Sequence, residues 1–298
     1  MRHRIVTKIK TILKTIKTMK TKNAFKYLMV AATVGILFTS CRKRNDEPRD
    51  SDTSSASDNA LAEGTYNDVH SIADEAAAGS LTSYMGTYNS EEKAYLSACA
   101  TITNDTTVTP HMLTINFGTT NCLCNDGRNR RGIINVSYSG HYRDSASTHT
   151  ITFNNYFVND NQVLGTKTVT NLGHNSAGHS SFSIVVNGQI IKAGGGGTIT
   201  WSSTRTREWI LGESTIPWSD DVYLITGTAS GTSAAGNSFN MVITNPLRKE
   251  IGCHYLVSGA LSLTPSGKPT RYVDFGTGAC DDQATVTING NVYNITLH

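Results

Sequence analysis

The chain has few of the residues that mark several common protein classes. It holds six prolines and three tryptophans in 298 residues, and only 16% of its residues are charged. Its longest apolar run, YLMVAATVGILF at 27–38, has 12 residues, whereas a helix needs about 20 to cross the hydrocarbon core of a bilayer. This run is therefore too short to be a membrane-spanning helix.

Basic residues are scarce outside the N-terminus. The first 40 residues contain nine of the 26 Lys and Arg and none of the 23 Asp and Glu, so residues 41–298 have 17 basic against 23 acidic residues, a net charge of −6. The net charge of the whole chain, +3, thus comes from the N-terminal segment. Since nucleic acids bind to basic surfaces, we expect no nucleic-acid partner.

The motifs of common catalytic and metal sites are also missing. The chain contains no G-x-S-x-G and no H-E-x-x-H, and GGGG at 194–197 lacks the strand–helix context of a phosphate loop. His174 and His179 could ligate a metal, but no carboxylate or third ligand lies near them in the sequence. We therefore expect no metal, no cofactor and no enzymatic activity.

The apolar run is typical of the hydrophobic region of a signal peptide. It follows a basic stretch and precedes the small residues TS and Cys41, which is the order of regions in a signal peptide. TSC at 39–41 resembles the lipobox of type II signal peptides, although Phe38 stands where Leu is usual. The resemblance implies that residues 1–40 are a signal peptide, cleaved before Cys41, and that acylated Cys41 binds the lipid bilayer. An ordinary or uncleaved signal peptide is the alternative.

The residues around this signal predict where the protein resides. Arg42 rather than Asp follows the cysteine, which by the same resemblance favours the outer over the inner membrane. The first 18 residues would form a basic amphipathic helix, unless translation starts at Met19. We favour Met19, because MKTKNAFKYLMVAATVGILFTSC is a complete lipoprotein leader.

The region after Cys41 is expected to be a flexible tether at 41–60, because RKRNDEPRDSDTSSASDN is almost free of apolar residues. Residues 61–298 are expected to form a single β-rich domain. It would begin with one short helix at about 61–79, where Tyr66, Val69, Ile72 and Ala76 recur at helical spacing.

From about residue 99 onward the sequence has the pattern of an all-β protein. Short runs rich in Thr, Val and Ile alternate with turn signals such as DG at 126–127 and NG at 187–188 and 289–290. Consecutive hairpins predict an antiparallel meander, either closed into a barrel-like form or doubled into a sandwich.

Two segments near the ends of this region are similar. CATITNDTTVTPHMLTINFGTTNC at 99–122 and the segment at 253–280 both start with Cys, contain TP and end in FGT-x-x-C. Each cysteine pair falls at the open ends of one predicted hairpin, where facing Cβ atoms lie close enough for a disulfide. In an oxidising compartment we expect the disulfides Cys99–Cys122 and Cys253–Cys280, with Cys124 free. Pairing of Cys99 with Cys124 is the alternative.

The candidate binding surface is WSSTRTREW at 201–209. In a strand, Trp201, Arg205, Arg207 and Trp209 would share one face. Such a face could bind a glycan or a partner protein. The alternative is an aromatic–arginine stack packed within the sheet, with Asp220 and Asp221 as candidate partners of the arginines.

Several of these segments together resemble uncharacterised lipoproteins of Gram-negative bacteria. They are YFVNDNQVLGTKTVTN, GTITWSSTRTREW, DDVYLITGTASG, NPLRKE and FGTGACDDQATVTINGNVYNITL. The resemblance implies a lipid-anchored β protein and assigns no catalytic residue. We therefore expect an outer-membrane lipoprotein that acts as a binding or structural module, with glycan binding or glycan processing at the surface as the alternative function.

Overall fold

The helix and the strands belong to one folded unit. The computed structural model describes residues 49–80, 95–215 and 220–297, and residues 50–298 form one compact unit. The predicted signal peptide, Cys41 and residues 42–48 of the predicted tether lie outside the described residues. In the described part of the chain, no helix is both long and apolar enough to cross a membrane.

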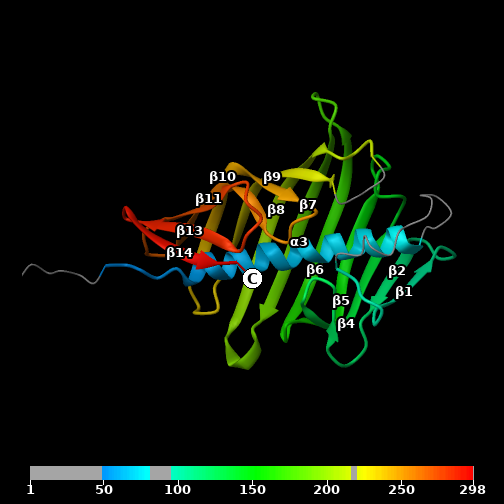
Figure 1. Cartoon of the computed structure of the whole chain (residues 1–298), viewed down its shortest axis with the longest axis horizontal. Helices are drawn as coiled ribbons and strands as arrows, with labels where there is room; N and C mark the ends of the chain where they lie inside the picture. The colour runs from blue at the N-terminus through cyan, green and yellow to red at the C-terminus, as the bar shows by residue number, and fades with distance from the viewer. Residues whose placement is uncertain (1–48, 81–94, 216–219, 298) are drawn as a thin grey trace, which may run out of the picture. The chain divides into compact units, whose positions relative to one another are not determined.

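All strands join one 14-stranded antiparallel sheet (Figure 1), in which strands follow one another in chain order and β3 pairs with β4 beside the main path. The predicted antiparallel meander is confirmed. The strands are β1 (Thr101–Asp105), β2 (His111–Asn116), β3 (Cys122–Leu123), β4 (Asn129–Tyr138), β5 (Thr148–Val158), β6 (Asn161–His174), β7 (Ser180–Ile191), β8 (Thr198–Leu211), β9 (Val222–Thr232), β10 (Ser238–Glu250), β11 (Leu256–Pro265), β12 (Arg271–Thr277), β13 (Gln283–Ile288) and β14 (Asn291–Thr296). A short 3-10 helix, η2 (Ala193–Gly195), connects β7 to β8.

The sheet is open, so neither expected closure occurs. No pairing joins β1 to β14 among the described strands, which rules out a hydrogen-bonded barrel, and a single sheet is not a sandwich. The helix α3 (Ser54–Ser80) lies across the strands on one face instead (Figure 1). It covers the apolar face that a second sheet would otherwise have to cover.

This helix is longer than predicted, because it begins at Ser54 inside the predicted tether. Ser54 N–H donates to Asp52 Oδ1 at 2.9 Å, which satisfies a free donor at the helix start. Residues 54–60 have low helix propensity, but Asp58 accepts from Ala234 N–H and Asn59 accepts from the Trp201 indole N–H. These contacts with the sheet stabilise the first turns of the helix where propensity does not.

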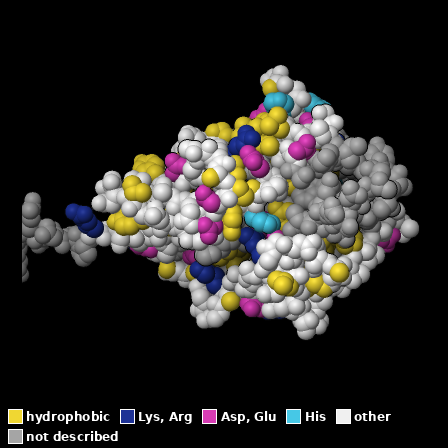
Figure 2. All heavy atoms as spheres, in the orientation of Figure 1, with side chains coloured by type: hydrophobic (Ala, Val, Ile, Leu, Met, Phe, Trp, Pro, Cys, Tyr) yellow, Lys and Arg dark blue, Asp and Glu magenta, His cyan; other side chains and the backbone are white. Residues whose placement is uncertain are grey.

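No residue of α3 between Ser54 and Ala77 is exposed. Alanines and aromatic residues such as Tyr66 join the main core, but Asp58, Glu63, Asp68, His70 and Glu75 are buried as well. Buried ionisable groups require partners, so the face of the sheet toward α3 must supply opposite charge. On the helix side of the molecule, the charges that remain visible are scattered rather than gathered in one patch (Figure 2).

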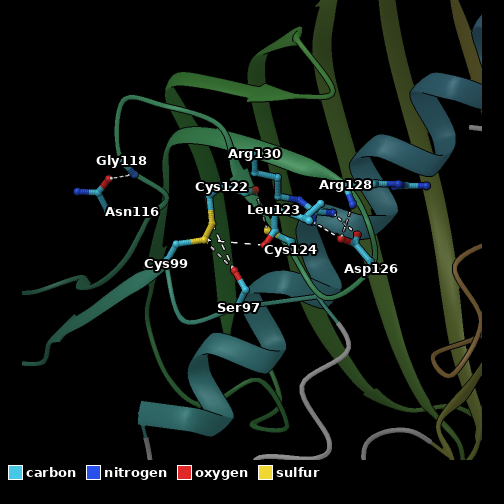
Figure 3. The surroundings of a disulfide bond; sticks show 10 residues. All are labelled: Ser97, Cys99, Asn116, Gly118, Cys122, Leu123, Cys124, Asp126, Arg128 and Arg130. Carbon is cyan, nitrogen blue, oxygen red and sulfur yellow. Dashed lines mark hydrogen bonds and ion pairs between the residues drawn. A yellow bond between two sulfur atoms is a disulfide. The ribbon is translucent and has the colours of Figure 1, made fainter.

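Both predicted disulfides are present. Cys253 and Cys280 flank the β11–β12 hairpin, with a Cα–Cα distance of 5.8 Å. Cys99 precedes β1 and bonds to Cys122 at the start of β3, with a Cα–Cα distance of 6.0 Å. Figure 3 shows this second bridge with Ser97 beside it; Ser97 Oγ lies 2.9 Å from Cys99 Sγ.

The repeated hexapeptide is a structural unit. In each copy the phenylalanine, Phe117 or Phe275, is buried, and the following glycine has a positive φ. The amide of Gly118 bonds to Asn116 Oδ1 and that of Gly276 to Asp274 Oδ1, each at 2.8 Å. A positive φ is strained for most residues but not for glycine, which explains why both copies have glycine at this position. The bend at this glycine directs the chain toward the second cysteine. The repetition therefore reflects two similar ends of the sheet rather than a catalytic signature.

Peptide mapping without reduction should recover Cys99 linked to Cys122 and Cys253 linked to Cys280. Cys124 is free and buried, and burial raises the pKa of its thiol. It should therefore react with an alkylating reagent only after the protein is unfolded. A Cys99–Cys124 bridge, or a bridge between the two ends of the sheet, would contradict this assignment.

Candidate functional site

The predicted Trp–Arg face exists, but it is not a surface. Trp201, Arg205, Arg207 and Trp209 point to the same side of β8 and are each 3–5% exposed. Thr200, Ser202, Thr204 and Thr206 point to the other side and are exposed. The shared face is confirmed, and it packs toward α3. The four side chains are therefore packed inside the protein, as in the alternative interpretation of an aromatic–arginine stack. They do not form a binding surface.

Side chains of α3 are the partners of this face. Arg205 Nη2 donates to Glu63 Oε2 at 2.6 Å, and both side chains are 3% exposed. Tyr66 stacks on Trp201 with ring centres 5.6 Å apart, and its hydroxyl donates to the Leu164 carbonyl at 2.8 Å. Gly188 leaves the room for this ring, since a Cβ there would lie 2.0 Å from the Tyr66 hydroxyl.

Arg207 lies in a second buried cluster. It contacts His70 Nε2 and the Tyr142 hydroxyl, and its guanidinium carbon lies 4.5 Å from the centre of the Tyr223 ring. Burial, with the nearby Arg207 charge, lowers the pKa of His70 to about 3. A histidine with that pKa is neutral at pH 7, and the same Nε2 lies 2.9 Å from Asp74 Oδ2.

The predicted acidic partners play a smaller part than expected. Asp221 is buried, and its burial, with the charge of Asp74, raises its pKa to about 7. Asp220 is exposed and accepts from Thr215. Among the described residues, neither Asp220 nor Asp221 forms a salt bridge with Arg205 or Arg207. The helix, which is distant in the sequence, supplies the carboxylate of Glu63 instead.

His174 and His179 each lie beside a glutamate. His179 Nδ1 lies 2.8 Å from Glu208 Oε1, and His174 Nε2 lies 3.5 Å from Glu213 Oε1. An opening of about 480 Å³ is lined by both histidines, Trp209 and Glu213. No group of three or more His, Cys, Asp or Glu among the described residues is arranged to hold a metal ion.

A larger groove, of about 1170 Å³, is lined by residues of β6 to β11 and of the β11–β12 turn. No residue of α3 lines it, and its side chains are those that point away from the helix. The groove therefore lies on the outer face of the sheet, opposite the buried Trp–Arg stack.

Two parallel rows of hydroxyl and amide side chains form its floor. The first row runs in register across five strands and consists of Asn187, Ser202, Ser230, Asn240 and Thr264. The second lies two residues away along the strands and consists of Gln189, Thr200, Thr232 and Ser238. Side chains directly opposite each other in such rows are about 4.5–5.5 Å apart. In the first row Ser202 Oγ donates to Asn187 Oδ1 at 2.9 Å.

The groove is close to neutral, and apolar residues such as Leu164, Pro265 and Pro269 share its lining with the polar rows. Lys268 is the one charged residue among those that line it, and its Nζ lies 2.6 Å from Asp52 Oδ2. Trp201 and Phe239 contribute backbone to the floor, but their rings are 3% exposed on the helix side. The groove therefore offers a ligand rows of hydrogen-bonding groups beside apolar contacts, and almost no charge.

Local sequence patterns do not reveal this groove. Its side chains are ordinary residues of a solvent-facing strand, and what distinguishes them is their alignment across five strands. The one feature of the sequence that could have indicated the groove is the recurrence of Ser, Thr or Asn at alternate positions of successive strands. Alignment of these positions depends on the register of each hairpin, which the turn residues alone do not specify.

Comparisons with known proteins supply no relative from which a function could be carried over. The chain matches no family model, no curated protein and no solved structure.

Proposed function

We propose that the chain is a lipoprotein anchored in the outer membrane through acylated Cys41, and that it acts as a binding or structural module rather than as an enzyme. The anchor is supported by the lipobox-like segment TSC at 39–41. The start of the compact unit at Asp50 leaves only a short connection after Cys41, as is suitable for a domain held close to a membrane.

The observation that carries the binding role is the contrast between the two faces of the sheet. Toward α3, cations such as Arg205 and Lys192 are paired with helix carboxylates. Their role is to hold the helix on the sheet. The outer face carries the groove, whose aligned hydroxyl and amide groups point away from α3. A groove with convergent polar groups is the default location of a ligand.

The same groove favours glycan binding over glycan processing. Glycosidases need two carboxyl groups about 5–10 Å apart on either side of the bond that is cleaved. No Asp or Glu is among the residues that line the groove, so its lining does not provide this pair. Of the two alternatives in the sequence analysis, glycan binding is the one we retain.

The anchor is tested by replacing Cys41 with serine. Wild-type protein should incorporate labelled palmitate, remain with membranes in high salt and reach the outer-membrane fraction of a density gradient. Cys41→Ser should take up no label and move to the soluble fraction, because a hydroxyl does not accept the lipid. Cys124→Ser is the matched control and should behave as wild type. Membrane retention of unlabelled Cys41→Ser would refute the lipoprotein assignment.

A further inference from the structure

We infer that the outer groove binds a neutral glycan strand laid across strands β7 to β11, an inference that specifies the ligand of the binding module proposed above. The aligned polar rows, the neutral lining and the width of the groove each support it.

The floor is wide enough for several sugar rings. The first row crosses five strands, from Asn187 on β7 to Thr264 on β11. Neighbouring strands are about 4.7–4.9 Å apart, so the row is about 19 Å long, and the second row is about 7 Å away along the strands. An extended chain with polar groups along both edges would meet donors and acceptors along its whole length.

The chemistry of the rows matches sugar hydroxyls. Ser and Thr hydroxyls both donate and accept, and Asn side chains offer an NH₂ donor and a carbonyl acceptor. Because Ser202 already donates to Asn187 Oδ1, the Asn187 amide NH₂ and the Ser202 oxygen lone pairs face solvent. A ligand that uses these groups must itself carry many groups that both donate and accept.

Other ligand classes fit less well. A polyanion such as a nucleic acid would require several cations, and the lining has only Lys268, which is paired with Asp52. A lipid chain would require a continuous apolar floor, but the two polar rows cross this floor and the rings of Trp201 and Phe239 are buried on the opposite face. A peptide added as a strand would require an edge, and the groove lies over β6–β11, all of which are paired on both sides.

One exposed aromatic ring lies beside the groove. Tyr272 is 58% exposed and pairs in register with Ser262, two residues before Thr264 of the first row. An aromatic face can stack on the apolar face of a sugar ring, and its hydroxyl can still bond to water or ligand. Tyr272 is therefore the stacking position that we assign to this site.

The inference is tested with the full chain in detergent, by affinity electrophoresis in gels that contain one polymer each. Dextran, laminarin and mannan represent neutral glycans from outside the cell. The O-polysaccharide released from the cell's own lipopolysaccharide represents an envelope glycan. Heparin and polylysine are the charged probes. We expect retardation by at least one neutral polymer and by neither charged one; which neutral polymer it is distinguishes the two sources.

Two lysine substitutions on β9 give a matched pair. Ser230→Lys places a long charged side chain in the middle of the first row, whereas Thr226→Lys places it at another exposed position on the same side of the same strand, outside the groove. We expect Ser230→Lys to weaken binding at least tenfold and Thr226→Lys to leave it unchanged. Asn240→Ala removes one hydrogen-bonding group and should weaken binding by about three- to tenfold.

Retardation by heparin or polylysine alone, retardation by none of the neutral polymers, or equal binding by Ser230→Lys and wild type would each overturn the inference. These outcomes are separate from the test of the anchor. A lipidated protein of the outer membrane that binds no neutral polymer would refute the glycan site alone. Binding by a chain that is never lipidated would refute the anchor and leave the site in place.

Discussion

Replacing Arg205 with alanine is expected to lower the free energy of unfolding by about 3–5 kcal/mol, the range measured when one partner of a buried ion pair is removed. The substitution leaves the Glu63 carboxylate buried, at 3% exposure, without its cation. It also removes the donor to the Thr228 carbonyl. In a domain of this size the loss corresponds to a fall in melting temperature of about 10 °C. Urea unfolding followed by circular dichroism would measure it.

Thr204→Ala is the control, since Thr204 precedes Arg205 on β8 and is exposed on the opposite face. It should change stability by less than about 0.5 kcal/mol. The double variant Arg205→Met with Glu63→Leu removes both charges and should recover most of the loss, because apolar pairs often replace buried ion pairs without a penalty. A decrease below 1 kcal/mol in Arg205→Ala would mean that the pair does not hold α3 on the sheet.

Local patterns predicted much of the fold. The alternation in β8 placed Trp201, Arg205, Arg207 and Trp209 on one face, and the spacing of cysteines around predicted turns gave both disulfides. Both predictions depend on contacts within a strand or between neighbouring strands. Such contacts follow from the two-residue period of a strand and from hairpin geometry.

Contacts between distant segments could not be predicted in this way. Alternation does not say which face of β8 meets solvent, and that is decided by α3, which is more than 100 residues earlier in the chain. The start of the helix at Ser54 depends on the contacts of Asp58 and Asn59 with β8 and with the loop after β9. The open sheet likewise depends on the helix, because α3 takes the place of a second sheet.

The polar character of α3 explains why the sequence analysis divided it between tether and helix. Ser, Asp and Asn at its start resemble a solvated linker, and the apolar spacing that predicted the helix is confined to the part after residue 60. Cations of β8 and of the connections next to β4 and β7 compensate: Arg205 pairs with Glu63, Arg128 with Asp68 and Lys192 with Asp58. Sequence-based rules for amphipathic helices assume an apolar partner face, and this partner face is partly basic.

Two buried lysines predict that the protein becomes more stable as the pH rises from 7 to 9. Burial lowers the pKa of Lys249 to about 7 and that of Lys167 to about 8. In the unfolded chain a lysine keeps its proton up to about pH 10. Between pH 7 and 9 the unfolded chain therefore binds more protons than the folded one, so the free energy of unfolding increases with pH. We expect an increase of about 3 kcal/mol over this window.

The increase should depend mainly on buried Lys249, whose Nζ donates to the carbonyl of buried Cys253 in the loop after β10. Lys249→Met should raise stability at pH 7, because methionine needs no deprotonation on burial, and it should remove most of the increase between pH 7 and 9. Lys268→Met is the control: its ammonium group is one third exposed beside Asp52, so the increase should remain. Urea unfolding at pH 7, 8 and 9 gives the comparison. A wild-type curve that is flat or falls over this window would show that both lysines stay charged when buried, with water or unrecognised partners around their ammonium groups.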